Sequence, residues 1–388
     1  MKHQGFLSTS DKPHYENVPF VVPSSWVWTT LGEIFTLQAG KNITAKDIYT
    51  EKSEEYKYPC FGGNGIRGYV AISNKIGEYP IIGRQGALCG NINLAHGSFY
   101  ATEHAVVVER YCDTDLMWGY YTLIALNLNQ YATATAQPGL AVNVINDVAI
   151  PLPPLHEQQR ISKSIKILFS FLDAIECEKL YLKTAISQTK TKVLDLAIHG
   201  RLVPQDPTDE PATELLKRIN PKAEITCDNG HYQKLPKGWC ETILKHVITI
   251  KSGYPINVRN CMQGHYPIYG GNGITGYTVD HNIKEPTIVV GRVGFYCGSV
   301  YLVKEKAWVS DNAFTITIHK DIFYKKYLYY LIQFLNLRKY SNSTAQPVIS
   351  GKTIYPIHVI IPPINEQHRI VSQIEEIFAQ LDAIEASL

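Results

Sequence analysis

The sequence contains two copies of one pattern, and this repeat limits the possible folds more than any other feature. The octapeptide Gly62–Tyr69 (GGNGIRGY) recurs as Gly270–Tyr277 (GGNGITGY), at an offset of 208 residues. Further along, Pro153–Ile161 (PPLHEQQRI) recurs as Pro362–Ile370 (PPINEQHRI), at an offset of 209. Because the offset drifts by only one residue between these segments, duplication explains the match better than chance. The sequence therefore predicts two copies of one domain and pseudo-two-fold symmetry.

Each copy has the pattern of an α+β domain with many short strands. Runs of Ile, Val and Tyr end at Gly, Asn or Pro, which is typical of strands followed by turns. Near the end of each copy a helix is predicted, over Met117–Gln130 and over Tyr324–Leu337. A last strand then leads into a Pro-Pro pair. The predicted strands are Tyr79–Gly83, Ala105–Val108, Val148–Ile150, Thr287–Gly291 and His358–Ile361.

After each Pro-Pro pair the apolar residues follow the 4-3-4-3 spacing of a coiled coil. In the first copy this spacing covers Ile161–Leu196, with Lys179 and Thr189 as its only polar interruptions. The spacing predicts one helix over about Glu157–His199, roughly 65 Å long at 1.5 Å per residue. Such a heptad pattern indicates a helix that pairs with another helix rather than one that lies on a sheet.

Composition indicates ordinary globular domains. The chain has 388 residues, enough for two or more domains with sizeable cores. A net charge of +2 argues against a nonspecific polycation but leaves room for a local basic surface. The eight Cys include no CxxC pair, so a zinc ribbon or redox motif is not expected. Cys89 and Cys297 occupy matching positions and are expected to be buried in a glycine-rich turn.

Taken in order, the repeated motifs resemble the specificity subunit of type I restriction–modification systems. Five motifs occur twice: Pro-x-x-Trp, Gly-Gly-Asn-Gly, Gly-Arg-x-Gly, Thr-Ala-Gln-Pro and Pro-Pro-x-x-Glu-Gln-x-Arg-Ile. The resemblance covers about Val18–Leu388. It implies two α/β target-recognition domains separated by long antiparallel coiled-coil helices. The implied boundaries are 1–154 and 231–363 for the two domains, 155–199 and 364–388 for the helices, and 200–230 for a linker.

The resemblance also implies a function and a set of partners. Each domain would read one half of a bipartite, asymmetric site in double-stranded DNA, and the halves need not match. The helices would set the unread spacer and dock two modification subunits, which restriction subunits join. No catalytic residue, metal or cofactor is expected in this chain, whereas S-adenosylmethionine, ATP and Mg are expected on the partner subunits. The expected location is the prokaryotic cytoplasm, because no signal peptide or membrane-spanning run is evident.

Several catalytic motifs are absent from the sequence. It has no P-loop and no HExxH metal motif. The segment Asn17–Phe20 (NVPF) is not the Asn/Asp-Pro-Pro-aromatic motif of adenine methylation. These absences favour a subunit that reads DNA while other subunits catalyse. The alternative is an enzyme with a hidden site, such as a nuclease that uses His and carboxylates in the divergent loops.

If the two domains read different half-sites, base-contacting residues should differ between the copies. Shared residues should then be framework or phosphate contacts, which carry no sequence information. The divergent segments are Lys41–Lys57 and Arg67–Asn74 in the first copy, and Lys251–His265 and Thr275–Asn282 in the second. Arg and Lys suit guanine, and Asn and Gln suit adenine. The alternative interpretation is that such residues are solvated loop residues without a ligand. The candidate residues are Lys41, Asn42, Lys46, Arg67, Tyr254, Asn257, Arg259, Asn260 and Gln263.

Four shared polar residues are further candidates for DNA contact: Arg84, Arg292, Gln137 and Gln346. The two arginines could clamp phosphate, or they could pair internally with the acidic residues Glu103 and Asp311. The two glutamines each precede a proline and could contact DNA or close a loop. The shared glycines either bring the backbone close to phosphate or serve a turn that needs positive φ.

The second coiled-coil helix departs from the family pattern of two long helices. Its spacing runs from Ile370 to Leu388, so it is about half as long as the first, roughly 35 Å. Packed antiparallel, it would cover Leu182–Leu196 of the first helix and leave an apolar stripe without a partner in the chain. We expect a modification subunit or a second copy of the chain to cover this stripe. The alternative is a truncated or decoy subunit that acts mainly as a protein-interaction module. The stripe consists of Ile161, Ile165, Leu168, Leu172 and Ile175.

Overall fold

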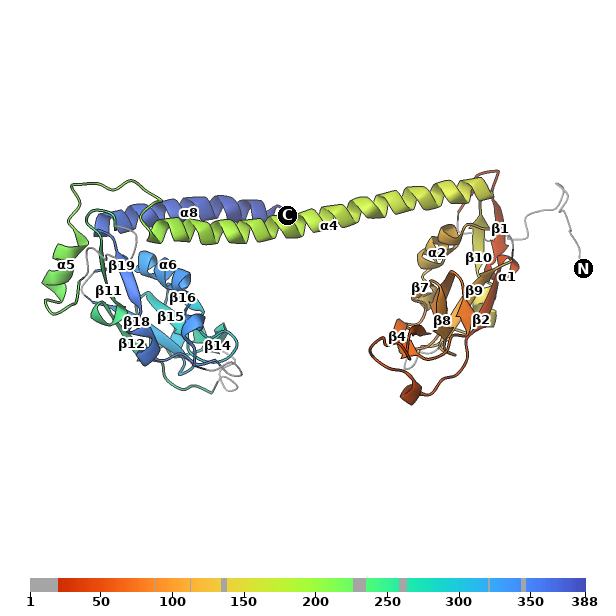
Figure 1. The fold of residues 1–388 in the computed structure, drawn as a ribbon, viewed down its shortest axis with the longest axis horizontal. Helices are drawn as coiled ribbons and strands as arrows, with labels where there is room; N and C mark the ends of the chain where they lie inside the picture. The colour runs from red at the N-terminus through yellow and green to blue at the C-terminus, as the bar shows by residue number, and fades with distance from the viewer. Residues whose placement is uncertain are drawn as a thin grey trace, which may run out of the picture. The chain divides into compact units, whose positions relative to one another are not determined.

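The chain divides into two compact units, Met1–Ile175 (unit 1) and Glu176–Leu388 (unit 2), in the computed structural model (Figure 1). The structure describes residues 20–86, 88–111, 113–133, 138–225, 235–257, 264–319, 322–342 and 347–388. One helix, α4 (Leu155–Ile198), begins in unit 1 and ends in unit 2. Among the described helices, none combines the length and the apolar character needed to cross a membrane.

In its described residues, unit 1 contains three small sheets. Their strands are β1 (Val27–Thr30), β2 (Phe35–Ala39), β3 (Tyr58–Gly62), β4 (Gly65–Val70), β5 (Lys75–Ile76), β6 (Tyr79–Gly83), β7 (Ile92–Ala95), β8 (Ser98–Ala101), β9 (Ala105–Arg110) and β10 (Ala149–Leu152). The largest antiparallel sheet has the order β2-β9-β6-β7. A second sheet has the order β4-β3-β8-β5, with β3 and β8 parallel. Strands β1 and β10 pair separately.

The continuous apolar run of β9 is explained by burial on both faces of its sheet. Val106 and Val108 belong to the core that the helices of unit 1 complete. Val107 points to the other side, where it joins Phe61 and Phe99 of the second sheet. Successive side chains of a strand alternate between faces, so one run fills two cores. The helices are α1 (Leu31–Ile34), α2 (Leu116–Ala125), α3 (Val142–Asn146) and the short 3-10 helices η1 (Ala45–Asp47) and η2 (Leu128–Tyr131).

Unit 2 repeats this topology. Its strands are β11 (Cys240–Ile243), β12 (Ile248–Ser252), β13 (Tyr266–Gly270), β14 (Gly273–Thr278), β15 (Thr287–Gly291), β16 (Val300–Val303), β17 (Trp308–Val309), β18 (Ala313–Ile318) and β19 (His358–Ile361). The order β12-β18-β15-β16 matches β2-β9-β6-β7, and β14-β13-β17 matches β4-β3-β8. The described helices are α5 (Ala212–Ile219), α6 (Lys325–Leu335), α7 (Gly351–Ile354), α8 (Ile364–Ala386), η3 (Leu244–His246) and η5 (Leu337–Tyr340). The sequence prediction of two α/β domains from one duplicated unit is confirmed.

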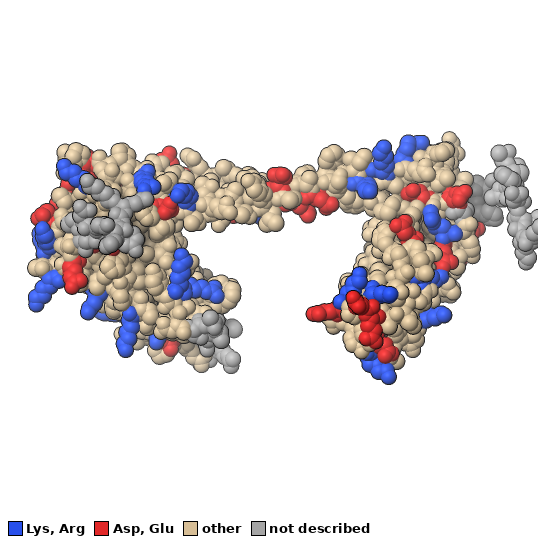
Figure 2. Space-filling view, in the orientation of Figure 1, with Lys and Arg blue, Asp and Glu red and all other residues tan. Residues whose placement is uncertain are grey.

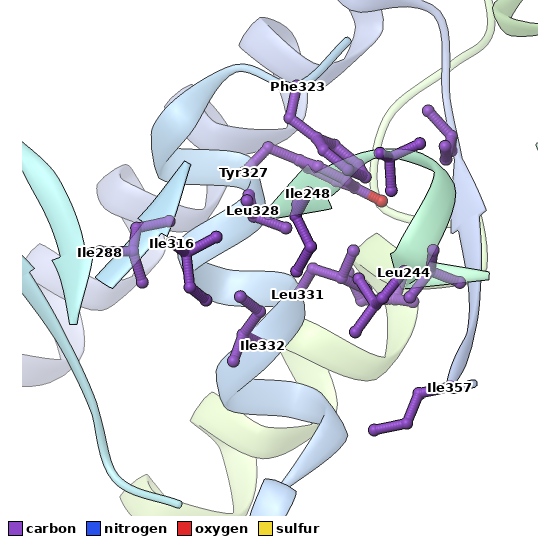
Figure 3. Close-up of a cluster of buried hydrophobic side chains, with 14 of the residues drawn as sticks. Leu244, Ile248, Ile288, Ile316, Phe323, Tyr327, Leu328, Leu331, Ile332 and Ile357 are labelled. Carbon is purple, nitrogen blue, oxygen red and sulfur yellow. The ribbon is translucent and has the colours of Figure 1, made fainter. Parts of the chain in front are cut away.

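The core of unit 2 lies between α6 and its four-stranded sheet (Figure 3). Helix α6 contributes Tyr327, Leu328, Leu331 and Ile332, which are fully buried. They face apolar side chains of the sheet, including Ile288, Ile248 and Ile316. Burial raises the pKa of the Tyr327 hydroxyl, which has no hydrogen-bond partner among the described residues. The apolar face of α6 thus holds the helix on the sheet, as expected for an amphipathic helix.

The predicted helices Met117–Gln130 and Tyr324–Leu337 are each broken near the end. α2 and α6 stop before Asn127 and Asn336, whose φ angles are 46° and 48°. Asn tolerates this left-handed conformation better than most residues, and it often ends helices there. A 3-10 helix, η2 or η5, follows in each unit.

Helix α8 packs antiparallel on the part of α4 that belongs to unit 2. Lys190 Nζ contacts Asp382 Oδ1 at 2.6 Å and Glu385 Oε2 at 3.1 Å, whereas Lys179 Nζ donates to the Leu388 carbonyl at 2.5 Å. Residue numbers therefore rise along α4 as they fall along α8. The buried seam includes Ile186, Val193, Ile370 and Ile374. The predicted cover of α4 by α8 is present at Ile186 and Val193, which are buried, whereas Leu182, beside the C-terminal end of α8, is still 38% exposed.

The segment after α4 is fastened to the start of α8. Gln205 Nε2 donates to Glu366 Oε1 at 3.2 Å, and Trp239 Nε1 donates to Glu366 Oε2 at 2.9 Å. Arg369 Nη2 forms an ion pair with the buried Asp209 at 2.7 Å. Burial raises the pKa of the Glu366 carboxyl, against the lowering effect of its two hydrogen bonds. This part of the predicted linker is therefore held by a partly buried polar cluster around the buried Glu366.

We expect the Glu366→Gln variant to gain stability relative to the wild type as pH rises. A carboxyl whose pKa is raised in the folded state contributes stability that is complete below its unfolded pKa, about 4.3, and is lost as pH rises through the folded value. The Gln side chain does not titrate, so the variant does not lose this contribution as pH rises. The measurement is denaturant unfolding from pH 4 to 8, with Glu157→Gln at the matching repeat position as control. Parallel pH profiles for Glu366→Gln and the wild type would contradict the expectation.

Candidate nucleic-acid interface

The shared glycine motifs form a common frame in both units. Gly65 and Gly273, with φ angles of 84° and 75°, close the hairpins β3–β4 and β13–β14. A Cβ atom placed on Gly83 would lie 1.9 Å from the Gly63 carbonyl oxygen, so the hairpin turn packs directly on the end of β6. Unit 2 has the same close approach at Gly291. These contacts support the interpretation of the glycines as turn and packing residues.

The turn that follows β6 or β15 joins the proline of the Thr-Ala-Gln-Pro motif to the frame. Gly86 N donates to the Pro138 carbonyl at 3.0 Å, and Gly294 N donates to the Pro347 carbonyl at 3.0 Å. Gln137 and Gln346, which precede these prolines, lie outside the described residues. Because Gly-Gly-Asn-Gly, Gly-Arg-x-Gly and the proline segments meet in each unit, the repeat preserves one local structure rather than separate motifs.

Arg84 and Arg292 belong to this frame, but their partners differ from those predicted. Arg84 Nε donates to the Leu140 carbonyl at 3.2 Å. The Arg292 guanidinium lies over the Phe314 ring, 5.4 Å from its centroid, and Nη1 contacts Ser252 Oγ at 3.5 Å. Within the described residues, neither arginine forms an ion pair with the matching acidic residue. The predicted internal Arg–carboxylate alternative was therefore wrong, because carbonyl and hydroxyl oxygens accept these hydrogen bonds instead.

In unit 1 the two divergent segments come together as one surface. Tyr49 and Tyr69 exchange backbone hydrogen bonds at 2.9 and 2.7 Å, which fixes the loop after β2 on strand β4. The Tyr49 and Tyr56 rings stack within the loop, with centroids 3.7 Å apart. The predicted residues Lys41, Asn42, Lys46 and Arg67 are all exposed on these segments. Their side chains are free to meet a ligand, but their role in DNA contact stays a prediction.

In unit 2 the divergent segments are also adjacent. Tyr254 N donates to the Val309 carbonyl at 3.0 Å, and the Trp308 indole donates to the Tyr254 carbonyl at 3.1 Å. Gly264 packs against the backbone of Thr278 at the end of β14. Tyr254 and Asn257 are exposed. Three further predicted residues lie outside the described part of the chain: Arg259, Asn260 and Gln263.

The sequence prediction missed a group of exposed side chains on the shared turn. Phe295 and Tyr296 are 70% and 47% exposed in unit 2, and Leu88 is 54% exposed in unit 1. They flank Cys297 and Cys89, which are buried as expected. Burial raises the pKa of both thiols, so both stay protonated and unreactive at neutral pH. The signal was available in the repeat, because the apolar residues beside the shared Cys differ between the copies.

Charges of both signs are present on the face of the molecule that Figure 2 draws. On the face drawn in Figure 2, Lys and Arg side chains are scattered over each unit and mixed with Asp and Glu. Such a surface agrees with the net charge of +2. On this face, contact with a polyanion would depend on a few local cations rather than on a broad field.

The predicted apolar stripe of α4 is exposed only in part. Ile161 packs against the core of unit 1, and Ile165 is half-buried. The prediction that Ile161 lacks a partner was wrong, because the first turns of α4 lie on their own unit. Leu168, Leu172 and Ile175 are each more than half exposed. Together with Phe171 beside them, they form an exposed apolar helix surface, at whose edge the Phe169 ring lies 5.8 Å from the Tyr121 ring.

A family model for the type I restriction modification DNA specificity domain matches residues 23–188 and 236–388. The type I restriction enzyme EcoprrI specificity subunit of Escherichia coli is 43% identical over 167 residues, which are 43% of this chain and 41% of that protein's length. A putative type I restriction enzyme specificity subunit of Haemophilus influenzae is 23% identical over 357 residues, covering 90% of this chain and 86% of the relative.

Two solved structures share the fold. A chain from a structure on complex assembly and conformational transition of the type I R-M system has a TM-score of 0.63 and 16% identity, covering 95% of this chain and 94% of that chain. The HsdS subunit from Thermoanaerobacter tengcongensis has a TM-score of 0.54 and 15% identity, covering 95% and 93%. The match extends over both units and the helices of this chain.

Proposed function

Because the chain belongs to the family of type I restriction–modification specificity subunits, we propose that each unit reads one half of a bipartite, asymmetric DNA site. The observation that carries this proposal is the combination of one preserved frame with two different surfaces. The glycine turns, the Arg-bearing turn and the proline segment keep the same backbone contacts in both units. The segments around them differ in sequence, and exposed polar side chains occur among their described residues.

This combination suits recognition of two unlike half-sites. Framework contacts carry no sequence information, whereas side chains that reach base edges do. The neighbouring divergent segments in unit 1 present Lys, Asn and Arg side chains from one surface. Unit 2 presents a different set, beginning with Tyr254 and Asn257. Different side chains on a common frame allow each unit to select its own bases.

The helices are assigned two tasks under this proposal. α4 is a single helix of 44 residues, roughly 65 Å long, so it is long enough to act as a ruler for an unread spacer. Its exposed apolar surface around Leu168 and Leu172 fits docking of modification subunits, which restriction subunits would join. The chain acts as a reader without catalysis of its own. S-adenosylmethionine, ATP and Mg are assigned to the partner subunits.

Mapping of methylated adenines tests the proposal. DNA from cells that carry the modification subunits should show methylation at one bipartite sequence with the chain present, and none at that sequence without it. A footprint of the purified complex on that site should weaken steeply with salt, because phosphate contacts release counterions. If the chain binds modification subunits but directs no sequence-selective binding or methylation, the decoy alternative is correct instead.

A further inference from the structure

Each unit presents an exposed apolar turn that the divergent loops do not include. In unit 2 the turn covers Gly294–Gly298, and Phe295 and Tyr296 lie at its tip with ring centroids 5.1 Å apart, edge to face. In unit 1 the matching turn exposes Leu88. Single exposed apolar residues are ordinary, but two neighbouring aromatic rings at the tip of a turn indicate a contact surface.

The backbone of this turn is held in the same way in both units. Cys297 N donates to the Gly294 carbonyl at 3.0 Å, and Gly298 N donates to the Gly291 carbonyl at 2.8 Å. The matching bonds in unit 1 are 3.0 and 2.7 Å. A Cβ atom on Gly298 would lie 2.5 Å from Arg338 N, so the turn is also packed tightly on η5. The frame is thus fixed while its tip differs: Phe-Tyr in unit 2 and Ala-Leu in unit 1.

Cations lie beside the aromatic tip of unit 2. The guanidinium carbon of Arg338 is 4.9 Å from the centroid of the Phe295 ring, and Lys339 follows on η5; both residues are exposed. The matching positions in unit 1 are the neutral Asn129 and Gln130. An apolar ring beside exposed cations is complementary to DNA, because the ring can pack on bases while the cations meet phosphates.

We propose that Phe295 and Tyr296 form an apolar wedge that packs against bases of the half-site read by unit 2, with Arg338 at a neighbouring phosphate. The proposal rests on the proposed function and adds a DNA-contacting element outside the divergent segments. The rings contact the bases and partly unstack two neighbouring base pairs. The wedge therefore favours DNA sequences whose base-pair steps unstack easily. Its contribution to selectivity differs from hydrogen bonding by the divergent loops.

The test uses the complex of this chain with its modification subunits and a duplex that carries the mapped bipartite site. 2-Aminopurine is placed at successive positions in each half-site, and its fluorescence reports unstacking. The variant Phe295→Ala/Tyr296→Leu gives unit 2 the tip residues of unit 1 and removes no charge. We expect about tenfold or more loss of affinity for the site, loss of the fluorescence rise in one half-site, and an unchanged salt slope. The variant Leu88→Ala in unit 1 should leave the fluorescence rise in the half-site read by unit 2 unchanged.

Each outcome separates the wedge from the proposed function. If the wild type selects the site and the double variant keeps its affinity and fluorescence, the wedge is wrong and the reading function stands. If the double variant folds but no longer binds modification subunits, the aromatic tip is a protein contact and the wedge is likewise wrong. If the wild-type complex selects no sequence, the proposed function fails, and the wedge fails with it.

Discussion

Replacing Leu168 and Leu172 together with aspartate should strongly weaken docking of modification subunits without unfolding the chain. Both leucines are more than half exposed, so the substitutions remove little of the chain's own packing. In a complex, each would instead place a charge in an apolar interface. Buried anchor residues each contribute about 2 kcal/mol or more, so the pair should weaken docking about a thousandfold.

The matched control is Leu180→Asp, an exposed leucine on the same helix that lies off the heptad seam. At its single site it introduces the same change in charge and helix propensity as each of the two test substitutions, and it should leave docking nearly intact. Complex formation is measured by titration calorimetry, and methylation of the mapped site is measured in cells. Full docking by the Leu168→Asp/Leu172→Asp variant would show that another surface binds the modification subunits.

The regular elements could be predicted because their sequence signals are periodic and occur twice. The strand Thr287–Gly291 follows directly from its Ile/Val run that ends at Gly, and the helix start near Pro154 follows from the heptad spacing after the Pro-Pro pair. The partner of a heptad residue could not be predicted in the same way. Ile161 has the right spacing for an exposed seam, yet it lies on the core of unit 1. The spacing of apolar residues predicts which face of a helix is buried, but it does not predict which element packs on that face.

The candidate interface was predicted less completely, because identity between the copies hides different roles. Shared residues such as Gln158 and Gln367 are buried, and each donates to the carbonyl of a proline in the Pro-Pro pair. Their role is structural, which agrees with the use of shared residues as framework. The turn at Cys297 also occurs in both copies, but the residues at its tip are exposed and differ between the copies. Comparison of the repeated motifs alone assigns the whole turn to the framework. The exposure of its side chains in the structure shows that Cys297 is buried, whereas the residues at the tip are exposed.

Exchanging both divergent segments of unit 1 should change one half of the recognised site and leave the other half intact. Lys41–Lys57 and Arg67–Asn74 must be exchanged together, because Tyr49 and Tyr69 join them through two backbone hydrogen bonds. The donor is a family member with a different half-site. Each mismatched base pair costs about 1–3 kcal/mol, so loss of two base contacts alone lowers affinity for the old half-site about a hundredfold.

Methylation mapping in cells gives the new site, and binding to duplexes with old and new half-sites gives the selectivity ratio. The reciprocal control exchanges residues 251–265 and 275–282 of unit 2, which should change the other half-site only. If one exchange changes both halves, the units do not read independently and the modular interpretation fails. If neither exchange changes the site, the bases are read elsewhere on the shared frame, for which the exposed turns at Leu88 and Phe295 are the next surfaces to exchange.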